Sequence, residues 1–241
     1  MKTNWVYRRL TLLAVVVSLV TFGQPSSNSA LAGCKDAAAP GVNWSGCFKE
    51  RKILSGHDMT GANLSHSILT GSDLGQTNLT KASLDGADLT HVSFRDANLG
   101  GATLSKAFGM RVTMEGAQLE GGVLEKAELF RANLRGASLK NVRAQKAQLA
   151  RADLTGAELI GTDLRYANIA RASFKDAKLE GVNFAGAYMY LARFEGVDLS
   201  SVEGLEQVQL NLSCGDDKTV LPSGLERPPS WPCPFQGSQT E

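Results

Sequence analysis

A five-residue hydrophobic period runs through the middle of the chain. Between Leu54 and Leu199 every fifth residue is large and apolar, with the exceptions Gly109 and Ala144. From residue 62 to residue 197 a small side chain stands two positions before each of these. No insertion or deletion interrupts the period, so the region is one continuous repeat rather than a series of different elements.

This period excludes a regular helix and a flat strand. On an α-helix five residues rotate by about 500°, so the apolar residues would form no stripe. On a flat strand an odd step places successive apolar residues on opposite faces. Glycine is frequent two positions after the large residue, as at Gly56, Gly61 and Gly71, and it accepts the positive φ of a tight turn. Short extended pieces that alternate with turns predict a solenoid.

The units Ala97–Gly101 and Ala152–Gly156 resemble the A-[DN]-L-x-x repeat of the pentapeptide-repeat family. The resemblance covers about residues 52–201. It implies an all-β fold: a right-handed quadrilateral parallel β-helix of four pentapeptides per coil, with about 7.5 coils for the whole run. The large residues would point inward. We therefore expect unfilled inward positions at Gly109 and Ala144, and we predict that Gly109→Leu is tolerated or stabilising.

Residues 1–32 have the organisation of a signal peptide. A basic head precedes the apolar run Leu10–Phe22, and an A-x-A cleavage signal ends at Ala32. An apolar run of this length spans about 20 Å as a helix, which is shorter than the hydrocarbon core of a bilayer. We predict cleavage between Ala32 and Gly33, with no stable membrane span afterwards. A permanent anchor is the alternative.

The segment Leu31–Cys34 also resembles a lipobox, so a lipid-anchored envelope protein acylated at Cys34 is a further alternative. Two features oppose it. A polar stretch, residues 23–29, separates the segment from the apolar run, and lipidation would leave an odd number of cysteines.

The cysteines form two local pairs on either side of the repeat. Export to an oxidising compartment favours disulfides for an even number of cysteines. Of three connectivities we favour Cys34–Cys47 and Cys214–Cys233, because the repeat would hold the two pairs far apart. Zinc binding is the alternative, but the spacings are not those of C-x-x-C sites. We expect the mature chain in the periplasm, an equivalent lumen or the extracellular space.

Both ends of a solenoid expose unpaired edges that need covers. We expect residues 33–51, with Trp44 and Phe48, to form the N-terminal cap. Residues 202–241 would form a C-terminal cap and a Pro-rich tail. A short helix within residues 202–213 would cover the last coil with Val202, Leu205, Val208, Leu210 and Leu212.

Residues 20 positions apart would lie above one another if each coil has four pentapeptides. This spacing reveals one column of arginines and one column of lysines, whereas the other two corners are mostly glycine. We interpret the columns as two adjacent basic sides with outward aromatics, a composition typical of interfaces. The alternative is a solvated surface neutralised by Glu125, Glu128 and Asp163. The candidate binding residues are Arg111, Arg131, Arg151, Arg171, Lys106, Lys126, Lys146, Phe108, Phe130, Tyr188 and Tyr190.

The net charge and the lack of catalytic motifs argue against several classes of function. The net charge of +1 argues against both a strongly basic nucleic-acid binder and a strongly acidic mimic of nucleic acid. Loss of residues 1–32 would lower the net charge only to −2. His57, His66 and His91 do not cluster, and we find no nucleophile elbow, P-loop or zinc-protease motif, so we expect no catalysis, no cofactor and no metal. Within the family, some members mimic DNA and occupy enzymes such as gyrase, but that role needs a strongly negative surface.

We therefore expect a rigid exported scaffold that docks a protein or an acidic envelope component. DNA mimicry is the alternative function. We also consider a homodimer, formed through the exposed aromatics or the C-terminal region.

Overall fold

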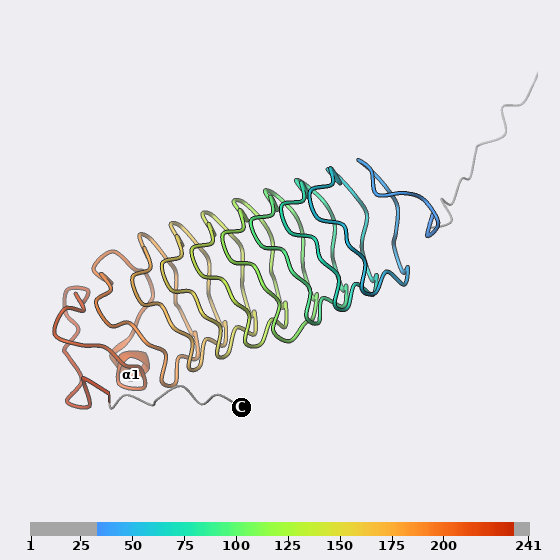
Figure 1. Cartoon of the computed structure of the whole chain (residues 1–241). Coiled ribbons are helices and arrows are strands. Elements are labelled where there is room, and N and C mark those ends of the chain that lie inside the picture. The colour runs from blue at the N-terminus through green and yellow to red at the C-terminus, as the bar shows by residue number, and fades with distance from the viewer. Residues whose placement is uncertain (1–32, 234–241) are drawn as a thin grey trace, which may run out of the picture. The chain divides into compact units, whose positions relative to one another are not determined.

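The computed structural model describes residues 33–233, so the predicted signal peptide lies outside the described residues. In this part the backbone winds into a stack of coils (Figure 1). Parallel bridges join residues 20 apart, beginning at Asn43 with Asn63 and continuing in this register to Asn183 with Glu203. The extended pieces are so short that the β-structure consists of isolated bridges. Among the described residues the single helix is α1, Gln207–Leu210.

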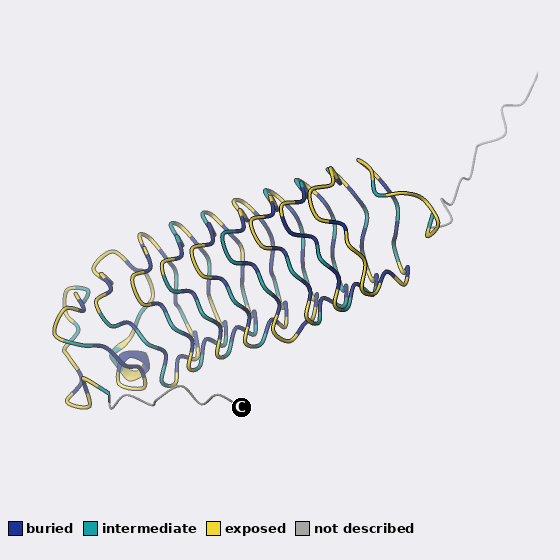
Figure 2. Cartoon of the chain, viewed as in Figure 1, coloured by how far each residue is buried: buried dark blue, intermediate teal, exposed yellow. Residues whose placement is uncertain are grey.

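Each pentapeptide turns two side chains inward. Ala87 and Leu89 are fully buried, whereas Asp88 between them points outward. The Asp88 N–H donates to the Ser67 carbonyl of the preceding coil, and the Leu89 N–H donates to the Phe108 carbonyl of the following coil. Backbone hydrogen bonds therefore tie every coil to both neighbours. Figure 2 shows buried and exposed positions alternating along each coil.

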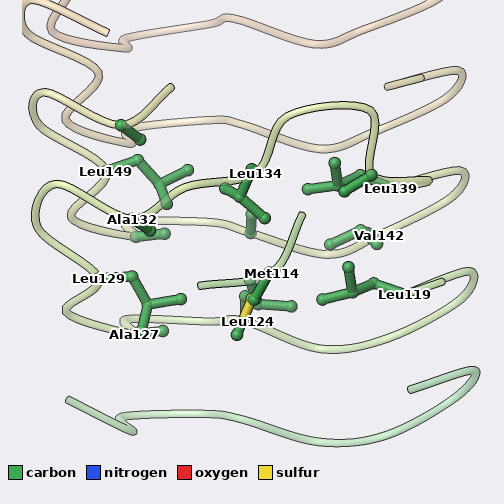
Figure 3. Packing of buried hydrophobic residues seen from close by; sticks show 14 of the residues in the cluster. Met114, Leu119, Leu124, Ala127, Leu129, Ala132, Leu134, Leu139, Val142 and Leu149 are labelled. Atoms are coloured by element: carbon green, nitrogen blue, oxygen red, sulfur yellow. The ribbon is translucent and has the colours of Figure 1, made fainter. Parts of the chain in front are cut away.

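The large residues stack along the axis of the coils. Figure 3 shows Leu149 above Leu129, and Leu139 above Leu119. All four leucines are at most 1% exposed. We name the four sides by the inward residues of one coil, Phe94 for side A, Leu99 for side B, Leu104 for side C and Gly109 for side D. Each side also includes the inward residues at 20, 40 and 60 positions before or after the one that names it, because the bridges join residues 20 apart in neighbouring coils.

The corners between sides have left-handed backbone. Gly101 has a φ of 64° and Lys106 a φ of 58°. The glycine pattern thus marks the turns, but many corners hold other residues. Among residues 33–233, seventeen non-glycine residues have positive φ, from Arg51 to Leu191. Such backbone costs a residue with a Cβ about 1 kcal/mol or more relative to glycine.

The coil geometry begins before the region where the repeat is obvious. Trp44 and Lys49 occupy inward positions and are 2% and 7% exposed. Phe48, which we expected to help cover the core, is 75% exposed because it occupies an outward position. The predicted disulfide between Cys34 and Cys47 is formed, with the two Cα atoms 5.5 Å apart.

Polar side chains contribute to the C-terminal end. The buried amide of Gln209 in α1 donates to the carbonyls of Phe184 and Ala187, both at 2.9 Å. Leu210 is buried, but Val208 and Leu212 are 62% and 40% exposed, so these two do not cover the last coil as expected. A four-residue helix places only part of its surface against the core.

The polypeptide after α1 rejoins the ladder. Cys214 bridges to Arg193 and Val220 bridges to Asp198, so the spacing grows from 20 to 21 and then 22 residues. The predicted Cys214–Cys233 disulfide is formed, with a Cα separation of 5.4 Å. Beside it the Trp231 indole N–H donates to the Ser213 carbonyl at 2.8 Å. Within residues 33–233 no helix has the length and apolarity needed to cross a membrane.

The inward position at Gly109 is already occupied by its neighbours. A Cβ added there would lie 2.7 Å from Val112 Cγ2 and 2.8 Å from the carbonyl carbon of Leu89. Our expectation of an unfilled site that tolerates leucine is therefore wrong. The glycine allows the backbone of one coil to approach the next closely.

Candidate functional site

The lysine and arginine columns border the same side of the coil stack. Turns at residues 105–106 and 110–111 flank the extended piece 107–109. Lys106 therefore stands at the corner where side D begins and Arg111 at the corner where it ends. The bridges repeat this arrangement every 20 residues. The two columns thus line the two edges of side D, rather than marking two different sides as we expected.

The structure brings the predicted basic residues together and adds members to each column. All seven predicted lysines and arginines are exposed. Arg51 has positive φ at a position 60 residues before Arg111, and Tyr166 has positive φ 20 residues after Lys146. Sequence reasoning missed Arg51 and Tyr166. The 20-residue spacing was sufficient to find them, but Arg51 lies before the regular pattern and Tyr166 is not basic.

No carboxylate neutralises the two columns. Within the described residues, none of the seven cations has a carboxylate oxygen within 4.0 Å. Glu125 instead pairs with Arg143 at 3.5 Å, and Asp163 pairs with Arg165 at 2.7 Å, both on side C. Glu128 lies on side D, and no ion pair with a residue of the described segment 33–233 engages it. The alternative of a neutralised surface therefore loses two of its three acids.

The ion pairs of the coils lie on the other three sides. On side B, hydrogen bonds from Lys140 and then Lys178 lower the pKa of Glu158 to about 2. On side C, the hydrogen bonds of Arg165 contribute most to lowering the pKa of Asp163 to about 2. Sides A, B and C therefore balance much of their own charge, whereas side D carries an excess of positive charge.

Many corners of side D hold residues that have a Cβ, although the left-handed backbone there favours glycine. Twelve of the seventeen non-glycine residues with positive φ stand in the two columns that border side D. The other two corner columns are mostly glycine. Each exposed cation thus combines unfavourable backbone with repulsion from like charges one coil away, about 4.8 Å along the axis. In the described part of the chain, no ion pair offsets these two costs for the seven cations.

Aromatic side chains lie between the columns at two places along side D, at residues 108–130 near its middle and at residues 188–190 near its C-terminal end. Phe108 is 45% exposed, whereas Phe130 is only half-buried and contributes less surface than expected. The rings of Tyr188 and Tyr190 are stacked with their centres 6.5 Å apart, and both are largely exposed. Met110 adds a further exposed apolar side chain beside Arg111.

Amides and small residues form the part of side D between Phe130 and the two tyrosines. Asn168 donates to the side-chain oxygen of Gln148 at 3.0 Å. Ala150 and Ala170 follow these amides in their coils and are partly exposed. We call the four residues the amide floor. Gln148 also donates to the Lys146 carbonyl at 3.5 Å, and the Asn168 side-chain oxygen accepts from the Ala170 N–H at 3.1 Å. The floor therefore presents amides that are held in place, with little side-chain bulk, beside Lys146 and Arg151.

A family described as Pentapeptide repeats (8 copies) matches residues 58–96, 93–136, 132–169 and 167–202. The chain belongs to the pentapeptide-repeat family. Together these segments cover more than half of the chain, and they include both basic columns from Lys106 to Arg171. Among curated proteins none matches.

Solved structures of pentapeptide repeat proteins are also similar. One is HetL, a pentapeptide repeat protein involved in heterocyst differentiation regulation in the cyanobacterium Nostoc sp. Strain PCC 7120. It is 23% identical to this chain, and the match covers 77% of this chain and 87% of that chain with a TM-score of 0.40. QnrB1, a plasmid-mediated fluoroquinolone resistance protein, is 16% identical over 75% of this chain and 89% of that chain, with a TM-score of 0.45. A protein of the Arabidopsis thaliana thylakoid lumen is 27% identical over 58% of this chain and 69% of that chain, with a TM-score of 0.16.

Proposed function

We propose that this protein is an exported, non-catalytic docking module that holds an acidic partner on side D. The module is a stiff right-handed quadrilateral β-helix of about 7.5 regular coils. The observation that carries the proposal is the set of seven exposed cations along two edges of one side, none of them with a carboxylate within 4.0 Å in the described part of the chain. A partner that supplies negative charge would relieve the repulsion within each column.

Disulfides support the exported location. Both cysteine pairs are joined, which is typical of proteins in oxidising compartments. Because Cys34 is bonded to Cys47, its thiol is not free for acylation. This bond favours simple cleavage between Ala32 and Gly33 over a lipid anchor at Cys34.

DNA mimicry is the weaker alternative. A mimic of the DNA backbone needs rows of negative charge, whereas side D carries rows of lysine and arginine. On sides B and C the carboxylates of Glu158 and Asp163 are engaged by cations of the same side. We therefore assign the docking function to side D.

The proposal is tested by removing one column. The triple variant Arg111→Gly, Arg131→Gly and Arg151→Gly keeps a residue that accepts the positive φ of each corner. The immobilised protein is exposed to envelope extract, and the retained anionic material is quantified at low and high salt. The wild type should retain a component that salt releases, and the triple variant should retain much less of it.

The matched control removes three positive charges elsewhere, by Lys81→Gly, Lys175→Ser and Lys218→Ser. These exposed lysines lie outside the two columns, so the control should retain the component as the wild type does. Equal retention by the wild type and the arginine variant would show that side D is not the docking surface.

A further inference from the structure

We propose that the acidic partner is a polysaccharide strand with carboxylated sugars, lying along side D parallel to the axis of the coils. This inference rests on the proposed function and names the class of its partner. Three features of side D carry it: the two rows of cations, the amide floor between them and the exposed aromatics before and after this floor along the axis.

The two rows favour a long, regular ligand. Arg111 and Arg171 are three coils apart, which is about 14 Å along the axis. A compact anion would contact only neighbouring members of one row and leave the others unneutralised. A strand that carries one negative charge per sugar unit presents its charges as a row, as the protein presents its cations.

The amide floor favours sugars over a membrane. An amide both donates and accepts hydrogen bonds, as a sugar hydroxyl does. Gln148 and Asn168 present such groups between Lys146 and Arg151, and the adjacent alanines leave room for a ligand to approach. A protein surface that inserts into an anionic membrane buries a strip of apolar side chains in the bilayer. The polar amides in the centre of side D would be unfavourable in the bilayer.

The aromatic side chains bracket the amide floor. Phe108 lies two coils before Gln148, with the exposed Glu128 in the coil between them, and Tyr188 lies one coil after Asn168 on the same bridge ladder. The faces of aromatic rings are negative, so they attract the slightly positive C–H groups of a sugar ring. Tyr188 and Tyr190 also bear hydroxyls that hydrogen-bond at the edge of such a contact.

The first experiment measures the binding of an oligogalacturonate by titration calorimetry, with the fully methyl-esterified oligosaccharide as the uncharged comparison. The double variant Lys146→Gly and Arg151→Gly should weaken binding at least about tenfold. The matched control, Lys81→Gly with Lys175→Ser, removes the same charge and should change binding less than about twofold. Glycine accepts the φ of 60° at residue 146 and 61° at residue 151, so the double variant should melt no lower than the wild type.

The second experiment separates sugar recognition from attraction to any polyanion. Gln148→Ala with Asn168→Ala should weaken oligogalacturonate binding about fivefold or more, because lost hydrogen bonds are not replaced. The same variant should bind inorganic polyphosphate as the wild type does. Equal losses for both probes, or no loss for either, would overturn the assignment to sugars.

The two proposals fail in different ways. If polyphosphate or phosphatidylglycerol vesicles bind in a manner that depends on Lys146 and Arg151 while oligogalacturonate does not bind, the polysaccharide assignment is wrong and the docking function stands. Equal binding of the esterified oligosaccharide would also contradict the assignment. If no anionic probe depends on Lys146 and Arg151, both proposals are wrong.

Discussion

The ammonium nitrogen of Lys49 lies 3.5 Å from the centre of the Trp44 indole ring, at the N-terminal end of the buried core. Leucine or another apolar residue fills the equivalent inward position in most later coils, as Leu69 does one coil on. Burial lowers the pKa of Lys49, and the nearby charge of Lys52 lowers it further. The folded state therefore disfavours the charged form that predominates at neutral pH.

We predict that Lys49→Leu raises the melting temperature at pH 7 by about 2–4 °C, which corresponds to roughly 1 kcal/mol for a chain of this size. The folded-state pKa is below the ordinary value of 10.5. The penalty is thus present at neutral pH and is relieved as the pH rises through the folded pKa towards that value. The gain in melting temperature from Lys49→Leu should therefore shrink as the pH rises through this range. A lower melting temperature at pH 7 would show that the contact with Trp44 outweighs the desolvation.

Gly109→Ala should destabilise the protein by about 1–3 kcal/mol, because the added Cβ would crowd backbone atoms of Leu89. Chemical denaturation measures the change. Gly100→Ala is the matched control, since its Cβ would approach only the side-chain oxygen of Asn98, at 3.2 Å. The control should change stability by less than about 0.5 kcal/mol. If Gly109→Ala is as stable as the wild type, the backbone at Gly109 is not packed as closely against Leu89 as these distances indicate.

Gln209→Leu should cost about 2–4 kcal/mol, because the buried carbonyls of Phe184 and Ala187 would lose their side-chain donor. The control Val208→Ala changes a neighbouring side chain that is 62% exposed. It should leave the unfolding midpoint nearly unchanged. A loss for Val208→Ala equal to that for Gln209→Leu would point to helix α1 as a whole rather than to the two hydrogen bonds.

Acid should weaken the fold through Glu158. Its pKa falls from 4.5 to about 2 in the folded state, chiefly because of the hydrogen bonds from Lys140 and Lys178. Stability from a lowered carboxyl pKa is fully present above the unfolded value and is lost as the pH falls through the folded value. Between about pH 4.5 and pH 2 the melting temperature should therefore fall less steeply for Glu158→Gln than for the wild type.

The matched control for this acid series is Glu180→Gln, which removes the same charge from an exposed position of side B. It should follow the wild-type pH profile. Parallel profiles for all three proteins would mean that the ion pairs of Glu158 contribute nothing to stability in acid.

The protein, denatured without reductant, should show no free thiol, because all four cysteines are paired. The variant Cys214→Ala with Cys233→Ala should be less stable by about 3 kcal/mol, since the unfolded chain gains the freedom of a 19-residue loop. Detection of four thiols in the wild type would contradict both disulfides and weaken the exported location.

The local pattern of apolar residues in the sequence was sufficient to predict much of the fold. The step of five between Leu54 and Leu199 excluded helix and flat strand, since neither geometry keeps such residues on one face. The 20-residue recurrence from Arg111 to Arg171 placed these residues in one column, and the bridge register agrees. Other features depend on contacts between coils. The crowding at Gly109 arises from Leu89 in the preceding coil and from Val112, which a single pentapeptide does not reveal.

The sequence by itself determined the repeating backbone and the inward and outward alternation, because both depend on spacing along the chain. It favoured, among three connectivities, the cysteine pairing that the structure has. Only the tertiary structure decided that Lys106 and Arg111 begin and end one side, and that the acids of the neighbouring side already pair with Arg143 and Arg165. Charge balance is a property of distances between side chains in adjacent coils, and those distances exist only after the coils have stacked.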